Sequence, residues 1–457
     1  MRYQIVICGR WLSVFFLCLL WGATLAWGAP RADYYTEVLP NGMRLVLYEN
    51  PRAPLCSLNI FCKVGGFEEN IETMGISHFF EHLFFRGTPS LTGHQFKRAI
   101  EALGGQTNAM TSRDFTHYFI NLPSRHALEG MELLADALKN AELDQEGIDQ
   151  ERNAVLEEYR MGLESPPRIV NQLVSEMAYG EHHPYSLPII GTESTIRSFN
   201  RADFLKFRDT FISPERTTVI VVGDFRREPM LALLRREFAN FTRPQRRIIS
   251  NYTPIKPPAG EVQQVQSSRL PLSMVMLAFV GPSVHDKPEI YQVDVLSFLV
   301  GLGRGSLINR QLVNKGRLQE GGVQFATQRF PGLIGLYGVG QVGQEERIKK
   351  DLLSIVRQVC EGRFSDRDLR RAKAFLRSNH TFATETNAGL ADNLGYYASI
   401  DDLHFVDTYL ERIEAVSRED IIEVAKRYLA GGYYCVLLKG TPPAPKAGER
   451  AEREAKS

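Results

Sequence analysis

The chain has 457 residues, of which 44% are hydrophobic and 23% are charged, and these proportions are those of an ordinary globular protein. They exclude a wholly disordered, collagen-like or coiled-coil chain, and the length predicts about two or three domains. The 54 basic and 53 acidic residues leave a net charge of +1, so no overall positive field favours nucleic acid or an anionic membrane as a partner.

Residues 1–29 have the three parts of a secretory signal peptide. Arg2 and Arg10 lie in a positive first segment, an apolar stretch follows at 11–26, and the Ala-Trp-Gly step at 26–28 offers a small-residue cleavage site. We therefore expect export, to a bacterial periplasm. No other run approaches about 18 apolar residues, so no stable membrane insertion is expected after cleavage. An uncleaved N-terminal membrane anchor is the alternative.

The first half of the chain alternates predicted strands and helices. Two strands are expected within 36–64, where apolar and polar residues alternate. Helices are expected at 72–86, 92–103, 124–140, 146–163 and 228–240, and further strands at 115–123 and 217–224. Several neighbouring strands are joined as hairpins while helices separate others. This order predicts an α+β fold, with a mixed sheet and helices packed on it.

Four cysteines remain after the predicted signal peptide. Cys56 and Cys62 are six residues apart on one predicted strand, which separates their Cα atoms by about 20 Å and excludes a bond between them. A bond between Cys360 and Cys435 stays open. Buried thiols that serve packing are the simpler interpretation for all four.

An internal repeat appears when the two halves of the sequence are laid over each other. Residues 195–211 align with 412–428 without a gap, and the two segments share an apolar stripe of helical period. Asn200 and Ser417 fall at the same place and are candidate N-caps. The repeat predicts two homologous α/β domains. We assign the N-terminal metal-binding domain to 30–241, a proline-containing linker to 242–262, the C-terminal homologous domain to 263–440, and a disordered tail to 441–457.

The candidate catalytic motif is His78-Phe-Phe-Glu81-His82. Residues four apart share one face of a helix, so both imidazoles can bind one metal ion. Glu81 lies at the edge of that face, where it can act on water as a general base. The intervening and following apolar residues (Phe79, Phe80, Leu83, Phe84 and Phe85) are expected to surround the site. The alternative is a helix with two surface histidines and a chance glutamate.

A third ligand has a candidate on the predicted helix 146–163. Glu151 and Glu158 are seven residues apart and share one helical face. One carboxylate can bind zinc, and the other can orient a ligand through a hydrogen bond. The alternative is an ordinary charged stripe on a solvated helix.

The segment from Gly75 to Thr88 resembles the signature of the pitrilysin and mitochondrial processing peptidase family, which contains the inverse-motif zinc peptidases. The chain is most similar to the half-size bacterial type. The resemblance implies one Zn²⁺ per chain, bound by His78, His82 and Glu158, the last of which stands where the family places its third ligand. It implies Glu81 and Glu151 as the catalytic carboxylates. It also implies the metallohydrolase fold of processing peptidases, with two homologous α/β roll domains, each a mixed sheet faced by helices.

The same resemblance implies an activity and a mode of substrate binding. The expected activity is endoproteolysis of unfolded peptides held in a closed chamber. Peptide substrate in this family adds to a sheet edge as a further strand, which would give Asn108 and Ala109 a binding role. The alternative for these two residues is an ordinary turn and strand end.

One departure from the family pattern concerns an Arg and a Tyr seven residues apart, which steady the substrate. Val313 and Glu320 occupy the comparable positions here. We therefore expect a homologous partner subunit that carries the Arg/Tyr pair, with this chain as the metal-bearing subunit of a two-chain enzyme. Two alternatives remain, a non-catalytic peptide-binding or scaffold member of the family and a zinc hydrolase of small molecules.

Overall fold

The computed structural model describes residues 34–242, 255–400 and 403–442, which belong to one compact unit. The predicted signal peptide at 1–29, much of the predicted linker at 242–262 and most of the predicted tail at 441–457 lie outside these ranges. No helix in the described ranges has both the length and the apolar character needed to cross a membrane.

The first half is built on a six-stranded mixed sheet in the order β1-β2-β8-β3-β7-β6. Only β2 and β8 pair in parallel, and the other neighbours are antiparallel. The central strands β3 and β8 are buried along almost their whole length, so both faces of the sheet are covered. The strands are β1 Tyr35–Val38, β2 Arg44–Glu49, β3 Leu55–Cys62, β6 Gln106–Thr111, β7 Thr116–Pro123 and β8 Thr217–Gly223. β4 Gly87–Thr88 and β5 Leu91–Thr92 form a separate small hairpin.

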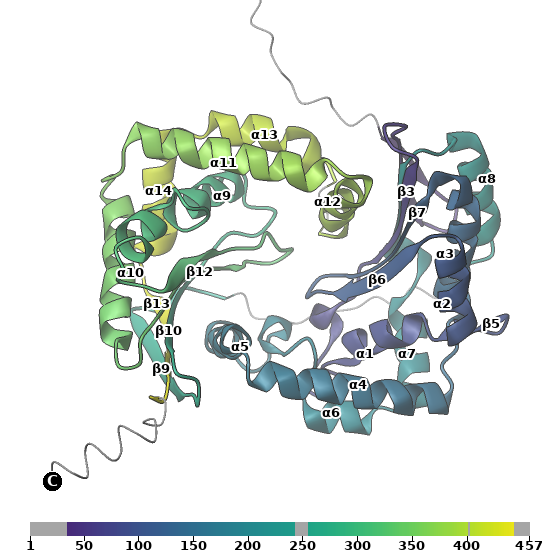
Figure 1. The fold of residues 1–457 in the computed structure, drawn as a ribbon, viewed down its shortest axis with the longest axis horizontal. Helices are drawn as coiled ribbons and strands as arrows, with labels where there is room; N and C mark the ends of the chain where they lie inside the picture. The colour runs from purple at the N-terminus through teal and green to yellow at the C-terminus, as the bar shows by residue number, and fades with distance from the viewer. Residues whose placement is uncertain (1–33, 243–254, 401–402, 443–457) are drawn as a thin grey trace, which may run out of the picture. The chain divides into compact units, whose positions relative to one another are not determined.

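The described part of the first half contains eight α-helices, most of which lie around this sheet (Figure 1). They are α1 Ile76–Phe84, α2 Gly93–Ala102, α3 Ala127–Asn140, α4 Gln145–Leu163, α5 Pro166–Tyr179, α6 Glu193–Ser198, α7 Arg201–Phe211 and α8 Arg227–Phe238. α1 begins four residues after the predicted start at 72, because Gly75 has a φ of +95° and a Cβ there would lie 2.7 Å from the backbone of Gly191.

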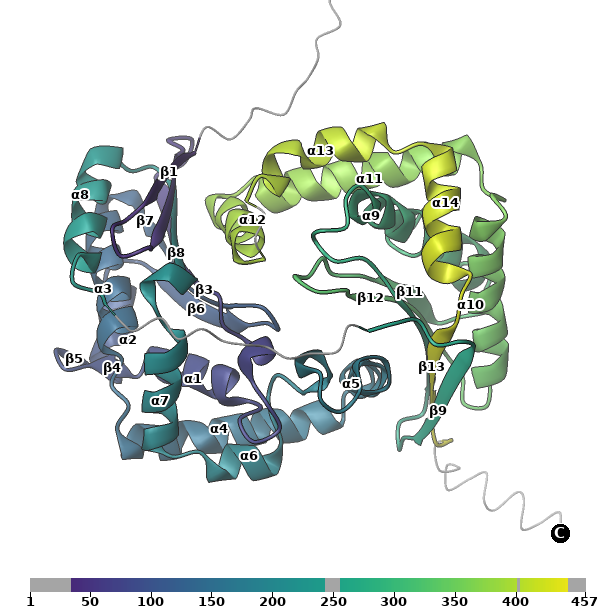
Figure 2. The same ribbon diagram turned by 180° about the vertical axis from the view of Figure 1, so that it is seen from behind.

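The second half holds a five-stranded sheet in the order β11-β12-β10-β13-β9, with helices packed beside it (Figure 2). Its strands are β9 Glu261–Ser267, β10 Ser273–Val280, β11 Glu320–Gln324, β12 Leu333–Gly340 and β13 Tyr433–Lys439. Its helices are α9 Glu289–Val300, α10 Glu345–Cys360, α11 Asp366–Thr384, α12 Asn387–Ser399, α13 Phe405–Ala415 and α14 Arg418–Leu429. β9 begins inside the range that the sequence assigned to the linker.

The internal repeat extends over the two halves. The order β2-β8-β3-β7-β6 in the first sheet corresponds to β9-β13-β10-β12-β11 in the second, with the same parallel and antiparallel pairings. In the register that lays 195–211 over 412–428, β7 coincides with β12 from its first residue to its last. Asn200 and Ser417 both cap their helices, each paired with an Asp three residues later in a capping box. The predicted fold class, two homologous domains with mixed sheets faced by helices, is confirmed.

Each half contributes one helix to the sheet of the other half. α12 packs on β3 and β8, where Ala391 and Leu394 join Phe61 and Ile220 in a buried cluster. α5 packs on β10 and β13, where Val170 joins a second cluster. In the register of the repeat α5 corresponds to 383–396, which overlaps α12, so the exchange of helices follows the repeat.

None of the four cysteines of the described ranges forms a disulfide bond. Cys56, Cys62 and Cys435 are buried, and Cys360 is half-buried with its Sγ 3.4 Å from the carbonyl oxygen of Ala425. The possible bond between Cys360 and Cys435 is not formed, and the interpretation as packing thiols fits this arrangement.

Candidate metal centre

The helix α1 presents its two histidines on one side because its other side is fixed in the core. Phe79 packs edge-on against Phe204 of α7, with ring centroids 4.9 Å apart, and Phe80 packs against Phe207 at 5.3 Å. Both phenylalanines are fully buried. Phe79 and Phe80 therefore anchor α1 in the core, and the expectation that apolar side chains surround the metal site stays a prediction.

The start of α1 is held by Glu69, a residue that the sequence did not single out. Its carboxylate accepts hydrogen bonds from the backbone N–H of Gly75 at 2.7 Å and of Ser77 at 2.8 Å. The side chain is buried at the N-terminal end of the helix, where it satisfies two backbone N–H groups that have no partner inside the helix. Glu69 therefore fixes the turn that immediately precedes His78.

His78, His82 and Glu158 meet at one point between α1 and α4. One ligand atom from each residue lies within 4.8 Å of the other two. Glu158 Oε2 is 3.5 Å from His78 Nε2 and 3.8 Å from His82 Nε2. Two imidazole nitrogens and one carboxylate oxygen form a donor set that suits zinc. No other such group of three occurs in the described part of the chain.

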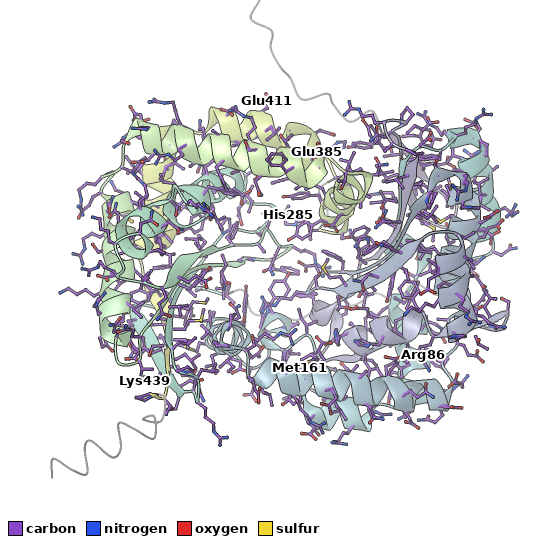
Figure 3. All side chains as sticks on the ribbon, viewed as in Figure 1. Arg86, Met161, His285, Glu385, Glu411 and Lys439 are labelled. Carbon is purple, nitrogen blue, oxygen red and sulfur yellow. The ribbon has the colours of Figure 1, made fainter. Side chains whose placement is uncertain are left out.

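Glu151 lies on the same side of α4 as Glu158, as their spacing predicts. Its Oε2 is 3.2 Å from Nδ1 of His82, so it holds the ring nitrogen that faces away from Glu158. Arg86, labelled in Figure 3, reaches the other oxygen of Glu151 at 3.2 Å. A carboxylate on the second nitrogen of a histidine ligand fixes the orientation and tautomer of its ring.

The charges in this cluster suit a cation. Burial, followed by the nearby His82, lowers the pKa of His78 to about 4, which keeps its imidazole neutral. The neighbouring His82 lowers the pKa of Glu158 to about 2, against the opposing effect of burial. Burial alone would lower the pKa of His82, but the hydrogen bond to Glu151 and the nearby carboxylate of Glu158 outweigh it and raise the pKa to about 9. The residues therefore fit a zinc ion, which would replace the proton on His82.

Glu81 lies beside this cluster without belonging to it. Its Oε2 accepts a hydrogen bond from the hydroxyl of Thr111 at 2.5 Å, and burial raises the pKa of its carboxyl group. The sequence analysis missed Thr111. The alternation along 106–111 could have indicated it, because residues 107, 109 and 111 share one face of the strand.

Asn108 and Ala109 lie inside the strand β6, so neither residue belongs to a turn. β6 is an edge strand whose only neighbour among the described strands is β7. The exposed Asn108 accepts a hydrogen bond on Oδ1 from the N–H of Ala109 at 2.9 Å. Both residues therefore stand on an open sheet edge that ends at Thr111, the partner of Glu81.

A cavity of about 620 Å³, called here the metal-side cavity, opens from the cluster. Its wall includes His78, Glu158 and Thr111 and continues over apolar residues of α4, α5 and the 187–191 loop. Arg113 and Arg168 also line it, and neither was predicted from the sequence. This volume lies within the usual range for ligand sites.

The second half has no counterpart of the cluster. In the register of the repeat, Val295, Phe298, Leu299 and Phe375 stand at the positions of His78, Glu81, His82 and Glu158. The rings of Phe298 and Phe375 contact each other at 5.7 Å, so apolar packing stands where the first half holds polar ligands.

Val313 and Glu320 take different structural roles from those of an Arg/Tyr pair. Val313 packs against the second core and ends a short π-helix at 309–313. Glu320 is exposed at the start of β11 and accepts a hydrogen bond from the hydroxyl of Tyr337 at 3.1 Å.

Comparisons with known proteins agree with this arrangement. Residues 44–193 match the family described as insulinase (peptidase family M16), and residues 198–376 match the peptidase M16 inactive domain. A relative from Rickettsia bellii (strain RML369-C), named "Uncharacterized zinc protease", is 26% identical over 399 residues, covering 87% of this chain and 95% of its own. Zinc protease PqqE of Helicobacter pylori (strain ATCC 700392 / 26695) is 25% identical over 416 residues, covering 89% and 93%. A solved structure of a protease from Helicobacter pylori has the same fold, with a TM-score of 0.85, 24% identity and coverage of 89% and 99%.

Proposed function

The chain belongs to the M16 family of peptidases, and from this premise we propose that it is a zinc-dependent endopeptidase. The observation that carries the proposal is the convergence of His78, His82 and Glu158 within 4.8 Å, with the partly buried carboxyl group of Glu81 between the two histidines on the same helix. A chance stripe of charged residues would not bring two helices together around three ligand atoms and a separate base. The matching positions of the second half are apolar, which supports a single zinc ion per chain.

The proposed chemistry divides the work among these side chains. Zinc held by the three ligands would act as a Lewis acid, which acidifies water and polarises the carbonyl group of a peptide bond. Glu81 takes the proton from the attacking water and passes it to the leaving amine. Thr111 holds the carboxylate in place through its hydrogen bond to Oε2. Glu151 keeps His82 in one orientation throughout.

The open edge of β6 supports the binding of an extended peptide. Backbone groups of a substrate can pair with this edge as a further strand, beside Asn108 and Ala109. The strand runs toward Thr111 and therefore toward Glu81. A peptide aligned in this way passes its backbone across the candidate metal centre, which favours unfolded peptides, enclosed in a chamber, over folded proteins.

We also infer that the chain requires a homologous partner. Val313 and Glu320 offer neither a cation nor a phenol of their own at the positions that the family uses to steady the substrate. A second copy of this chain would repeat the deficiency. The partner would carry the Arg/Tyr pair and would not need the His-x-x-Glu-His motif.

Zinc content and peptide hydrolysis, measured on the same samples, test the proposal. The full chain is expected to bind one zinc ion and to cleave internally quenched peptides slowly alone and faster with its partner. If the chain binds zinc and peptide but hydrolyses no peptide, either alone or with a partner subunit, the alternative of a non-catalytic peptide-binding member is supported. A preparation that cleaves as fast alone as in any mixture would contradict the need for a partner.

A further inference from the structure

Arg113 is a partly buried cation beside the candidate metal centre, and it has no acidic partner among the described residues. Its Nη2 donates to the hydroxyl of Ser175 at 2.8 Å, and its Nε is buried without a hydrogen-bond partner. The guanidinium group lies 5.7 Å and 5.4 Å from the ring centres of Tyr179 and Tyr185. These contacts hold the side chain in place but leave its charge unneutralised.

Asp114, the carboxylate next to Arg113 in the chain, pairs with other residues. Asp114 accepts hydrogen bonds from the hydroxyl of Tyr185 at 2.5 Å and from the backbone N–H of Arg329 at 3.2 Å. The side chain of Arg329 also pairs with Asp114 and with Glu68, both at 3.4 Å. Arg329 is therefore a neutralised buried arginine, and Arg113 is not. A buried charge without a counter-ion is costly unless a ligand supplies one.

Arg113 is positioned where a ligand can reach it. It lines the metal-side cavity and also a second cavity of about 250 Å³, so open volume adjoins it on two sides. Arg168 lines the metal-side cavity as a second cation, 3.3 Å from Glu158 Oε1. Glu158 belongs to the metal cluster, and Glu176 is held by the amide of Gln172 at 2.8 Å. Arg168 thus has a carboxylate partner, whereas no carboxylate of the described residues pairs with Arg113, which leaves this cation open to an anionic ligand.

Resting on the proposed peptidase function, we propose that Arg113, assisted by Arg168, binds a carboxylate group of the substrate close to the cleaved bond. Thr111 contacts Glu81, and Arg113 follows Thr111 by two residues. The Cα atoms of Thr111 and Arg113 are therefore at most about 7 Å apart. A bound carboxylate therefore belongs to a residue within about three positions of the cleaved bond. Its source is an acidic side chain or the C-terminal carboxylate of a short peptide.

The test compares substrates that differ by one group. A quenched peptide without charged residues, amidated at its C-terminus, receives Glu, Gln or Lys at each position in turn. At one position within three residues of the cut, we expect kcat/KM for Glu to exceed that for Gln by about tenfold, because hydrogen bonds between charged groups are the strong ones. The preference should weaken as salt increases. A parallel peptide with no acidic residue and a free C-terminus detects capture of the terminal carboxylate.

Variants then connect the preference to Arg113. Arg113→Gln should remove the difference between Glu and Gln peptides while zinc content stays complete, and Arg113→Lys should keep part of it. The control is Arg160→Gln, because Arg160 is exposed on α4, pairs with Glu157 and lines neither cavity. Near-ultraviolet circular dichroism checks folding. If Arg113→Gln does not fold, the peptide series and its salt dependence, both measured on the unaltered chain, still test for the carboxylate subsite.

Binding separates this proposal from the proposed function. The zinc-loaded Glu81→Gln chain should bind the Glu peptide about tenfold more tightly than its Gln counterpart in a fluorescence anisotropy titration. If the peptides bind with this difference but the unaltered chain hydrolyses none of them, the carboxylate subsite is supported and the peptidase function is contradicted. Equal hydrolysis and equal binding of Glu, Gln and free-terminus peptides would keep the peptidase and overturn the subsite.

Discussion

Glu81 and Glu158 lie around the same pair of imidazoles, yet their surroundings drive their proton affinities in opposite directions. Burial raises the pKa of Glu81, whereas the neighbouring His82 lowers the pKa of Glu158 to about 2. The first carboxyl group can therefore exchange protons, and the second stays an anion. Such a separation is what a general base and a metal ligand need in one site.

Glu81→Gln should abolish hydrolysis and leave zinc binding intact. Glutamine preserves the shape and the hydrogen bond to Thr111, but its amide cannot accept the proton of water. We expect a loss in kcat of about 10²-fold or more, the contribution of a general base. Steady-state kinetics on samples with a measured zinc content provide the check. Turnover close to normal in a fully loaded sample would remove Glu81 from the mechanism.

Glu158→Gln should instead deplete the metal. The substitution removes the only anionic donor of the cluster, and replacing both His78 and His82 by Ala should have the same result. Glu157→Gln is the matched control, because that side chain is 67% exposed and pairs with Arg160. Zinc content by mass spectrometry after dialysis distinguishes the two. Full occupancy in Glu158→Gln would contradict the ligand assignment.

At the scale of the element, α1 shows what could be predicted from sequence. Spacing alone placed His78 and His82 on one helical face, and Glu151 and Glu158 together on another. The spacing could not predict where α1 begins, which side chains anchor it in the core, or that Glu81 and Thr111 share a hydrogen bond. Those features depend on contacts between segments far apart in sequence. α5 was missed as well, although it lines the metal-side cavity.

Glu69 gives α1 a testable dependence on pH. Burial raises the pKa of its carboxyl group to about 7, although the N–H groups of Ser77 and Gly75 act in the opposite direction. The folded chain then keeps a proton that the unfolded chain releases near pH 4.5, so stability from this group falls as pH rises from about 4.5 to 7. The free energy of unfolding falls by about 3 kcal/mol over this pH range.

Glu69→Gln should remove that pH dependence. Its amide cannot ionise, but it accepts only one of the two N–H groups at the start of α1. The variant should therefore be clearly less stable than the unaltered chain at pH 4.5, with a difference that narrows by pH 7. Urea unfolding of both chains at these two values measures the change. A difference that stays constant or widens with pH would show that Glu69 is already ionised at low pH in the folded protein.

At the scale of the whole molecule, the two halves are joined by the exchange of α5 and α12. Phe330 from the second half also stacks on Phe67 of the first at 4.4 Å, and Tyr179 donates to the carbonyl oxygen of Pro331 at 2.9 Å. Residues of the second half, among them Met276 and Phe325, line the smaller of the two cavities that Arg113 borders. The second half, which has no metal cluster among its described residues, therefore still helps to build the surroundings of Arg113.

The tightest point of this exchange is Gly395 on α12. A Cβ atom at this position would lie 1.9 Å from the ring of Phe61, which is fully buried and stacks on His117 at 3.8 Å. Gly395→Ala must therefore push α12 away from the first sheet. Overpacking of this kind costs about 1–3 kcal/mol. Gly431→Ala is the control, because a Cβ there meets nothing within 4 Å.

Combining Gly395→Ala with Phe61→Leu should recover part of the lost stability, because a smaller side chain makes room for the new methyl group. The two changes should then be strongly non-additive, as expected for residues in direct contact. Urea unfolding of the four chains of this double-mutant cycle measures the coupling, and limited proteolysis reports whether α12 has lifted from the sheet. If Gly395→Ala is as stable and as resistant to protease as Gly431→Ala, the close approach of α12 to β3 does not hold the two halves together.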